Sequence, residues 1–210
     1  MTSVSAVDPR TLSTLIENHD FDNIAQLILN QSTLSVSDGK RSNPQKYSIC
    51  EIEMYCHDSK HSDPYVHCHK EQGNYGRWYF HRASKNDDSK YRGGTYKGLD
   101  IALGSSTRFF GILIRSIMKE NTIIEGPCCS VNEILKSADV KSIDELTGNK
   151  PLPVNDPKLT LTLYSTPISN YSISKGIRVG LKAKNETNYL NAKYRFTTMP
   201  NKLKKGGKFD

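Results

Sequence analysis

Two glutamates and a tyrosine alternate with apolar residues in the segment CEIEMYC, residues 50–56. Because successive side chains of a β-strand point to opposite faces, Glu51, Glu53 and Tyr55 share one face of the expected strand. A carboxylate held in this way beside a cavity can serve as the general base that activates a water molecule. A strand with one face in solvent gives the same alternation, so the pattern leaves both interpretations open.

Charged residues also interrupt two other apolar segments. Arg115 lies in FFGILIRSIMK, on the face of Leu113 and Ile117. Asp100 lies in YKGLDIALG, between two large apolar residues. A buried guanidinium requires a carboxylate, and a buried aspartate is costly unless it is paired or functional. Together with Glu53, these residues predict a pocket in which the arginine keeps a water-orienting carboxylate ionised. A purely structural network of buried ions is the alternative.

Aromatic and cationic residues are interleaved in GRWYFHR, residues 76–82. One face of the expected strand carries Arg77, Tyr79 and His81, and the other carries Trp78, Phe80 and Arg82. Rings beside cations are typical of surfaces that stack nucleobases and contact phosphates, although rings of an ordinary strand pack in the core. The next segment, SKYRGGTYKG, places Arg92 and Lys97 around a glycine turn that could approach a phosphate.

Histidines and cysteines are concentrated in CHDSKHSDPYVHCH, residues 56–69. Their spacing matches no common two-plus-two arrangement of zinc ligands. We therefore interpret these histidines as loop residues that line a pocket, and we expect neither a metal nor another cofactor.

The composition favours a polyanionic partner. The 210 residues include 29 Lys and Arg against 22 Asp and Glu, a net charge of +7, which attracts nucleic acid or an anionic surface. Part of this excess lies in NKLKKGGKFD, residues 201–210, which predict a disordered basic tail. Five cysteines, two of them adjacent, are typical of reduced thiols in an intracellular protein, nuclear if the source is eukaryotic. No apolar run is long enough to span a membrane.

The order of the expected elements predicts one α+β domain, mixed and mostly antiparallel. Residues 1–45 are expected to form a short helical arm over residues 8–30, followed by a linker at 35–45. Residues 46–200 are expected to form the domain, with helices at 130–137 and 142–146 and strands at 47–56, 76–82, 97–103, 108–118, 159–165, 176–182 and 192–198.

The ordered set of segments from residue 47 to residue 200 resembles the alkyladenine (3-methyladenine) DNA glycosylase family. It runs from Glu53-x-Tyr55 through a histidine loop, GRWYF, YKGLDIALG, GILIRSI and EGP to IRVGL and KYRFTTMP. The resemblance implies that family's fold and a monomeric enzyme of base-excision repair. Such an enzyme flips an alkylated purine out of double- or single-stranded DNA and hydrolyses its N-glycosidic bond without a metal.

The resemblance also implies roles for individual residues. Glu53 would activate the water and Arg115 would position it. The flipped base would be held by Tyr55, by His67 or His61, by His81, and by Asp100, which stands where the family has an asparagine and could favour a cationic or amino-bearing base. The expected nucleic-acid contacts are Arg77, Arg82, Arg92 and Lys97, with Tyr91 as the substitute for the family's intercalating tyrosine.

Two other functions remain compatible with the sequence. A non-catalytic module could use the same pocket to bind a modified base, a nucleotide or single-stranded nucleic acid. Alternatively, the protein could hydrolyse small nucleosides, a reaction that would also use the carboxylate of Glu53.

Overall fold

The segment that carries Glu53 forms the long central strand of the structure. The computed structural model describes residues 9–84, 90–183 and 188–210. The helices are α1 (Pro9–Glu17), α2 (Phe21–Asn30), α3 (Pro127–Ser137) and α4 (Ile143–Thr147), with short 3-10 helices η1 (Lys70–Gly73) and η2 (Gly94–Tyr96). The strands are β1 (Ser32–Val36), β2 (Gln45–His57), β3 (Arg77–Phe80), β4 (Leu99–Ala102), β5 (Phe109–Lys119), β6 (Thr122–Glu125), β7 (Leu152–Pro153), β8 (Asn155–Asp156), β9 (Leu159–Leu163), β10 (Ser174–Gly176) and β11 (Arg195–Thr197).

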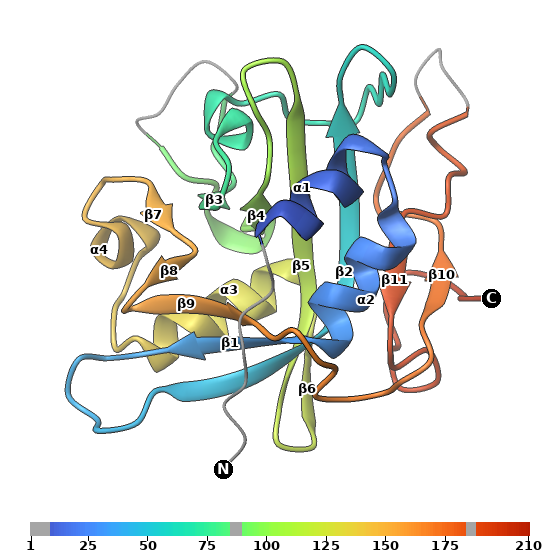
Figure 1. The fold of residues 1–210 in the computed structure, drawn as a ribbon. Helices are drawn as coiled ribbons and strands as arrows, with labels where there is room; N and C mark the ends of the chain where they lie inside the picture. The colour runs from blue at the N-terminus through green and yellow to red at the C-terminus, as the bar shows by residue number, and fades with distance from the viewer. Residues whose placement is uncertain (1–8, 85–89, 184–187) are drawn as a thin grey trace.

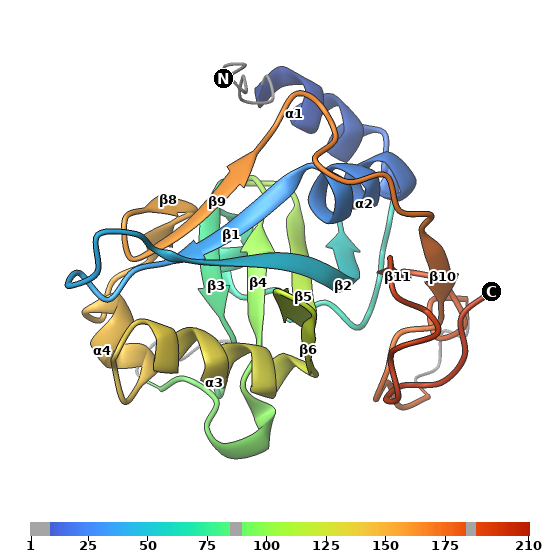
Figure 2. The ribbon, with the colours of Figure 1, turned by 90° about the horizontal axis from the view of Figure 1, so that it is seen from below.

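These strands form a single antiparallel sheet that curves into a nearly closed barrel (Figure 1). Its main path runs β7-β3-β4-β5-β2-β1-β9-β8, while β11 also pairs with β2 and β6 pairs with β5. The helices α1 and α2 lie on one side of this sheet and α3 on the other (Figure 2). The expectation of a mixed, mostly antiparallel α+β protein is confirmed. Within the described residues, no helix has the length and apolar character needed to cross a membrane.

The pairing of β2 with β5 is interrupted where the charged residues lie. Glu51 pairs with Ser116 but Ile52 pairs with Ile114, so Arg115 has no residue directly opposite it. Such bulges redirect side chains and are common beside active sites. Arg115 consequently lines the same cavity as Leu113, whereas Ile117 packs in the core. The expectation that Arg115 shares a face with both apolar neighbours therefore holds for Leu113 alone.

The N-terminal segment is part of the core. The helix α2 buries Phe21, Ile24 and Ile28, and its first turn is capped by Asp20, which accepts a hydrogen bond from the backbone of Asn23. We expected a linker at residues 35–45, but β1 extends to Val36 and pairs with both β2 and β9. The composition of this segment is polar, yet its alternating apolar residues are buried, and that alternation decides the strand.

The C-terminal segment also differs from the expected disordered tail. The guanidinium of Arg195 donates hydrogen bonds to the carbonyl oxygens of Lys205 and Gly206, and it lies 4.1 Å from the centroid of the Phe209 ring. The backbone of Lys204 donates to the Glu125 carboxylate at 2.8 Å. Arg195 is buried and therefore needs hydrogen-bond acceptors, which the C-terminal segment supplies. These contacts order a segment whose composition alone predicts disorder.

Candidate active site

Glu53 lies at the wall of a cavity with both carboxylate oxygens in contact with donors. It is fully buried, at 0% exposure. Its Oε1 accepts a hydrogen bond from the Val179 backbone at 2.7 Å and lies 3.1 Å from Arg115 Nη1, while Oε2 accepts from the Tyr55 hydroxyl at 2.8 Å. Burial raises the pKa of Glu53, and the charge of Arg115 opposes this rise. Three donors facing two oxygens favour the ionised carboxylate, the form that a general base requires.

Glu51 has a different role from Glu53, although both project from the same face of β2. Its Oε1 accepts from Arg115 Nε at 2.9 Å and from Arg195 Nε at 2.7 Å, and its other oxygen accepts from Ser116. Glu51 is 1% exposed and does not line the cavity. The solvated-face interpretation of the two glutamates is therefore wrong. Glu51 holds Arg115 in place, and Arg115 reaches Glu53.

Arg115 remains a cation in this setting. Burial disfavours its charge, but the carboxylates of Glu53 and Glu51 outweigh that effect and raise the pKa of Arg115. A planar guanidinium can contact one carboxylate through Nε and another through Nη1, a geometry that a lysine ammonium does not offer. The bulge at this position is what aims the guanidinium between the two glutamates.

Two adjoining cavities lie at the site, and Glu53 lines the larger of them. The larger, of about 530 Å³, is lined by Glu53, Arg115, Leu113, the N-terminal end of α3 and the backbone around Val179. The smaller, of about 240 Å³, is lined by Tyr65, His67, Gln72, Asp100 and Leu181. Tyr55, His81 and Arg92 line both. The structure thus brings together Glu53, Arg115 and the four residues expected to bind substrate, Tyr55, His67, His81 and Asp100.

Asp100 and His81 form a pair at the boundary of the two cavities. Asp100 Oδ1 lies 2.7 Å from His81 Nε2, and Oδ2 accepts from Gln72 Nε2 at 3.1 Å. Two glycines make room for this pair. A Cβ at Gly111 would lie 2.6 Å from Asp100 Oδ2, and one at Gly98 would lie 2.5 Å from His81 Nδ1. The buried aspartate in the apolar strand β4 is therefore paired, as expected because burying an unpaired carboxylate costs free energy.

His67 is the histidine that borders the smaller cavity. Its Nε2 accepts a hydrogen bond from Arg92 at 2.7 Å, which leaves Nδ1 as the protonated nitrogen, 2.7 Å from the Tyr79 hydroxyl. Burial lowers the pKa of His67 to about 4, assisted by the nearby His81 and Arg92. His61, the other histidine considered for base stacking, contacts Phe21 and Tyr194 and lines a different cavity. Of the two histidines, His67 is the one that lines a cavity at the site.

Tyr55 presents its ring between a cation and the cavity. The Arg178 guanidinium lies 4.6 Å from the centroid of that ring and pairs with Asp63. Burial, followed by the charge of Glu53, raises the pKa of Tyr55, so its hydroxyl stays protonated and donates to Glu53. An electron-rich ring held this way is suited to stacking on a flat ligand.

Several expected nucleic-acid contacts lie elsewhere. Arg82 is buried, pairs with Glu71 at 2.8 Å, and stacks 3.7 Å from the centroid of the Tyr91 ring. Tyr91 packs against Phe80, and its hydroxyl lies 3.2 Å from Thr147 Oγ1. Arg82 and Tyr91 therefore stabilise the interior, and Tyr91 is not placed to insert into a duplex. The two residues face each other across an isolated β-bridge that follows β3.

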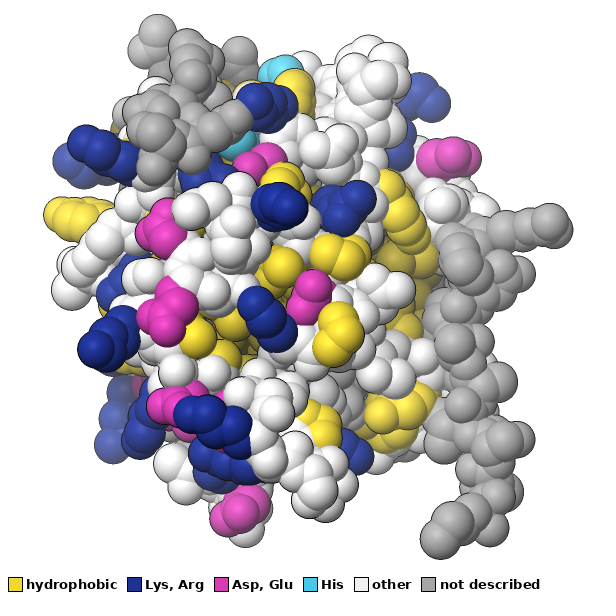
Figure 3. Space-filling model, turned by 90° about the vertical axis from the view of Figure 1, so that its left-hand side faces the viewer, with side chains coloured by type: hydrophobic (Ala, Val, Ile, Leu, Met, Phe, Trp, Pro, Cys, Tyr) yellow, Lys and Arg dark blue, Asp and Glu magenta, His cyan; other side chains and the backbone are white. Residues whose placement is uncertain are grey.

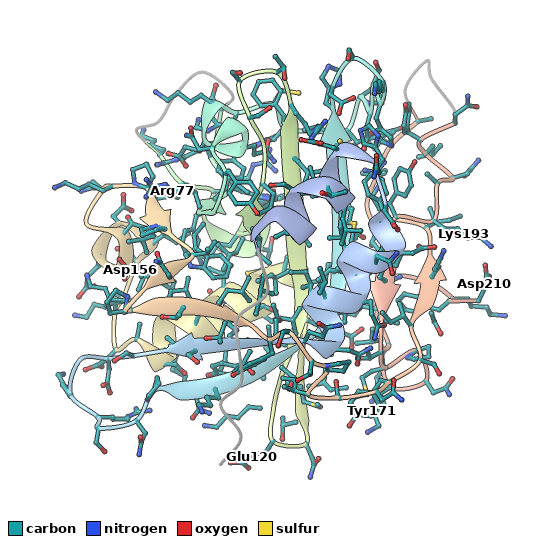
Figure 4. All side chains as sticks on the ribbon, viewed as in Figure 1. Arg77, Glu120, Asp156, Tyr171, Lys193 and Asp210 are labelled. Carbon is teal, nitrogen blue, oxygen red and sulfur yellow. The ribbon has the colours of Figure 1, made fainter. Side chains whose placement is uncertain are left out.

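The other three predicted nucleic-acid contacts lie in two different parts of the structure. Arg77 lies on β3 where it pairs with β7, at the edge of the sheet (Figure 4). Arg92 and Lys97 line the larger cavity, as expected for residues that approach a substrate. Lys205 also lines this cavity. The sequence does not indicate this position, because the composition of residues 201–210 predicts disorder.

Tyr96 is a second residue that the sequence analysis did not select. It ends η2, lines the larger cavity, and is 75% exposed. It shares the segment SKYRGGTYKG with Tyr91, which was chosen in its place. The adjacent glycines, Gly93 and Gly94, were the available signal, because they mark a turn whose tip projects from the sheet.

A small group of possible metal ligands lies apart from Glu53. One ligand atom each from His19, Cys56 and Asp58 lie within 4.8 Å of one another. Asp58 Oδ2 already lies 2.7 Å from Arg108 Nε and 2.8 Å from His19 Nε2. The guanidinium neutralises the carboxylate and would repel a metal cation, so this group suits an ion pair better than a metal.

The fold and the site define a mixed α+β protein on a nearly closed antiparallel sheet, with a buried glutamate and arginine at a cavity wall. No profile of a known protein family matches the chain. Over 202 residues it is 34% identical to "Uncharacterized protein L759" of Acanthamoeba polyphaga mimivirus, and the match covers 88% of each chain. The chain therefore belongs to the same family as this mimivirus protein.

Proposed function

We propose that the protein is a DNA glycosylase of the alkyladenine glycosylase type, which hydrolyses the N-glycosidic bond of a flipped, alkylated purine in DNA. One observation carries this proposal. A buried carboxylate, Glu53, lies beside Arg115 at the wall of a cavity that continues into a pocket lined by Tyr55, His67 and Asp100. A water activated at Glu53 would thus stand next to a site shaped for a flat base.

The reaction follows from this arrangement. Glu53 accepts a proton from a water that attacks C1′ of the sugar, as the bond to the purine breaks through a cationic, oxocarbenium-like transition state. Arg115 keeps Glu53 ionised and orients the water. A positioned general base of this kind contributes about 10²- to 10⁴-fold to the rate. A base that already carries a positive charge leaves readily, so one carboxylate suffices for it.

Base recognition is assigned to the smaller cavity. The Tyr55 ring stacks on the flipped base, and the ring of His67 borders it. The Asp100 carboxylate attracts a base that carries a positive charge or exocyclic amino hydrogens. The attraction to positive charge distinguishes a cationic alkylated purine from the neutral, unmodified bases of DNA.

Contact with DNA is assigned to the rim of the larger cavity. Arg92, Lys97 and Lys205 place positive charge where the phosphates of an extruded nucleotide would pass. The exposed ring of Tyr96 at the same rim is the residue we propose to fill the gap that a flipped nucleotide leaves in the duplex.

Release of free base tests the proposal directly. The protein is incubated with methylated duplex and single-stranded DNA, and released purines are quantified by mass spectrometry. The wild type is expected to release methylated purines, and Glu53→Gln is expected to lower the rate at least about 100-fold because the general base is lost. Glu120→Gln, in the turn after β5, is the matched control and should retain the wild-type rate.

Two outcomes would reject the assignment. Equal release by Glu53→Gln and wild type would remove Glu53 from the chemistry. Salt-dependent binding of DNA by the wild type without any base release would instead favour a non-catalytic module that recognises a modified base. The observation that favours this second function is that three protein donors already contact the two carboxylate oxygens of Glu53.

A further inference from the structure

The segment of residues 204–210 lies against the turn that supplies a donor to Glu53. The backbone N–H of Val179 donates to Glu53 Oε1 at 2.7 Å. Gly206 packs directly on the Val179 side chain, because a Cβ built at Gly206 would overlap Val179 Cγ2. Val179 and Lys205 also line the larger cavity. The segment therefore reaches the site through Val179 as well as through Lys205.

This segment is fastened before, at and after Gly206. Before it, the backbone of Lys204 donates to the Glu125 carboxylate at 2.8 Å. At Gly206 itself, the carbonyl oxygen accepts a hydrogen bond from the Arg195 guanidinium. After it, the Phe209 ring packs on the same guanidinium, 4.1 Å from its central carbon to the ring centroid. These contacts fix the position of Gly206 against its neighbour.

Arg195 connects the segment to the ions behind the site. It is buried, at 0% exposure, and its Nε donates to Glu51 Oε1 at 2.7 Å. Glu51 in turn accepts from Arg115, the cation that lies 3.1 Å from Glu53. Arg195 therefore supports two of the donors on the carboxylate, Arg115 and the Val179 backbone.

We propose that residues 204–210 form a positioning segment, in which Gly206 holds the backbone N–H of Val179 on the Glu53 carboxylate. This inference rests on the proposed glycosylase function and deepens it. It assigns a part in the chemistry to Gly206, which acts through Val179 and not on the base or the water.

Loss of the Val179 donor has a defined effect on Glu53. Burial raises the pKa of this carboxyl, and the charge of Glu51 adds to the rise. Arg115, the Val179 N–H and the Tyr55 hydroxyl lower the pKa. Displacing the N–H should therefore raise the pKa of Glu53 further and leave less of the ionised base at a given pH. The rate of base release should fall, and it should fall most at low pH.

Gly206→Ala tests this contact, and Gly207→Ala is its matched control. Both glycines have a positive φ, +87° and +81°, so alanine meets similar backbone strain at each position. A Cβ at Gly207 meets nothing within 4 Å, whereas a Cβ at Gly206 would overlap Val179 Cγ2 and lie 2.8 Å from Arg195 Nη1. Because the valine side chain is stiff, the displacement should pass to the Val179 backbone.

The first measurement is single-turnover release of methylated purine from duplex DNA. Gly206→Ala is expected to lower the rate about 10- to 100-fold, the range for one lost hydrogen bond to a charged group, while the affinity for the duplex stays within about threefold. The pH at which the rate falls off on the acid side should move upward. Gly207→Ala should match the wild type in all three respects.

The second measurement reads the contact without catalysis. A ¹³C NMR titration of the Glu53 carboxyl carbon, assigned with Glu53→Gln, should give a higher pKa in Gly206→Ala than in the wild type or Gly207→Ala. The double variant Gly206→Ala with Val179→Ala removes the overlapping methyl group. It should recover part of the lost rate and lower the pKa of Glu53 again, a coupling that two independent sites would not show.

The outcomes separate this inference from the proposed function. An unchanged rate and pKa in Gly206→Ala, equal losses in both glycine variants, or no recovery in the double variant would each overturn the inference. If the wild type releases base and the glycine variants share its Glu53 pKa, the glycosylase stands without the positioning segment. If the wild type releases no base but Gly206→Ala alone raises the pKa of Glu53, the positioning segment stands and the glycosylase function is rejected.

Discussion

Glu51 and Glu53 show how two identical side chains on one strand face acquire different chemistry. Glu51 contacts two arginines and a serine and has no access to the cavity. Glu53 contacts one arginine and lies at the cavity wall. Removing a partner from a buried ion pair costs about 3–5 kcal/mol, so Glu51 is expected to matter for stability and Glu53 for catalysis. The two glutamates differ because β5 and β11 place different side chains beside them. The sequence of β2 alone does not specify these neighbours.

A pH-dependent stability is expected from His67. Its folded-state pKa is about 4 against 6.5 for the free side chain, so the unfolded chain binds a proton that the folded chain refuses. Stability from this residue is present above pH 6.5 and is lost as pH falls toward 4. Over this window the unfolding free energy of the wild type should fall by about 1–2 kcal/mol more than that of His67→Gln, a value reduced for the partial exposure of the ring.

Urea denaturation at a series of pH values measures this effect. His57→Gln serves as the control, because it removes a histidine at the end of β2 and leaves the contacts of His67 with Arg92 and Tyr79 intact. Identical pH dependence of wild type and His67→Gln would contradict the assigned neutral state of His67.

At the scale of elements, the sequence predicts which side chains share a face of β2 and of β3. It does not predict the register in which neighbouring strands pair. His81 lines the site and Tyr79 contacts His67, while Trp78 packs in the core, as period-two alternation allows. The bulge that redirects Arg115 depends on how β5 pairs with β2, which no single segment encodes. β1 was missed because its serines suggest a linker, although buried Leu34 lies within it.

The segment between β3 and β4 gives a second prediction. Tyr91 is turned inward and Tyr96 outward, so the intercalating function is expected from Tyr96. Tyr96→Ala should lower base release from duplex DNA at least about tenfold and leave release from single-stranded DNA nearly unchanged, because only the duplex requires a wedge. The measurement is the ratio of the two rates under single-turnover conditions.

The control for this prediction is Tyr171→Ala, which removes another exposed tyrosine, one that lines neither cavity. Its duplex and single-strand rates should match the wild type. A parallel loss on both DNA forms in Tyr96→Ala would show that Tyr96 shapes the cavity and does not act as a wedge.

Across the whole molecule, the distribution of charge matters more than the net charge of +7. On the side that carries α4 and β7 to β9, Lys and Arg side chains are interspersed with Asp and Glu (Figure 3). The rim of the larger cavity instead gathers Arg92, Lys97 and Lys205. Arg195 donates a hydrogen bond to the Lys205 carbonyl oxygen through Nη2 and contacts Glu51 through Nε. The ion network behind the site therefore also positions one edge of the proposed DNA-binding surface.

This distribution predicts which lysines bind phosphate. Each of Lys97→Ala and Lys205→Ala should weaken duplex binding regardless of sequence and reduce the slope of log affinity against log salt by about 1, because one phosphate contact and its released counterion are lost. Lys40→Ala changes the net charge equally but removes a lysine that pairs with Asp139 away from the cavity. Fluorescence anisotropy over a salt series measures the slopes. If all three variants changed the slope alike, binding would follow net charge, and the rim of the cavity would not be the surface that meets DNA.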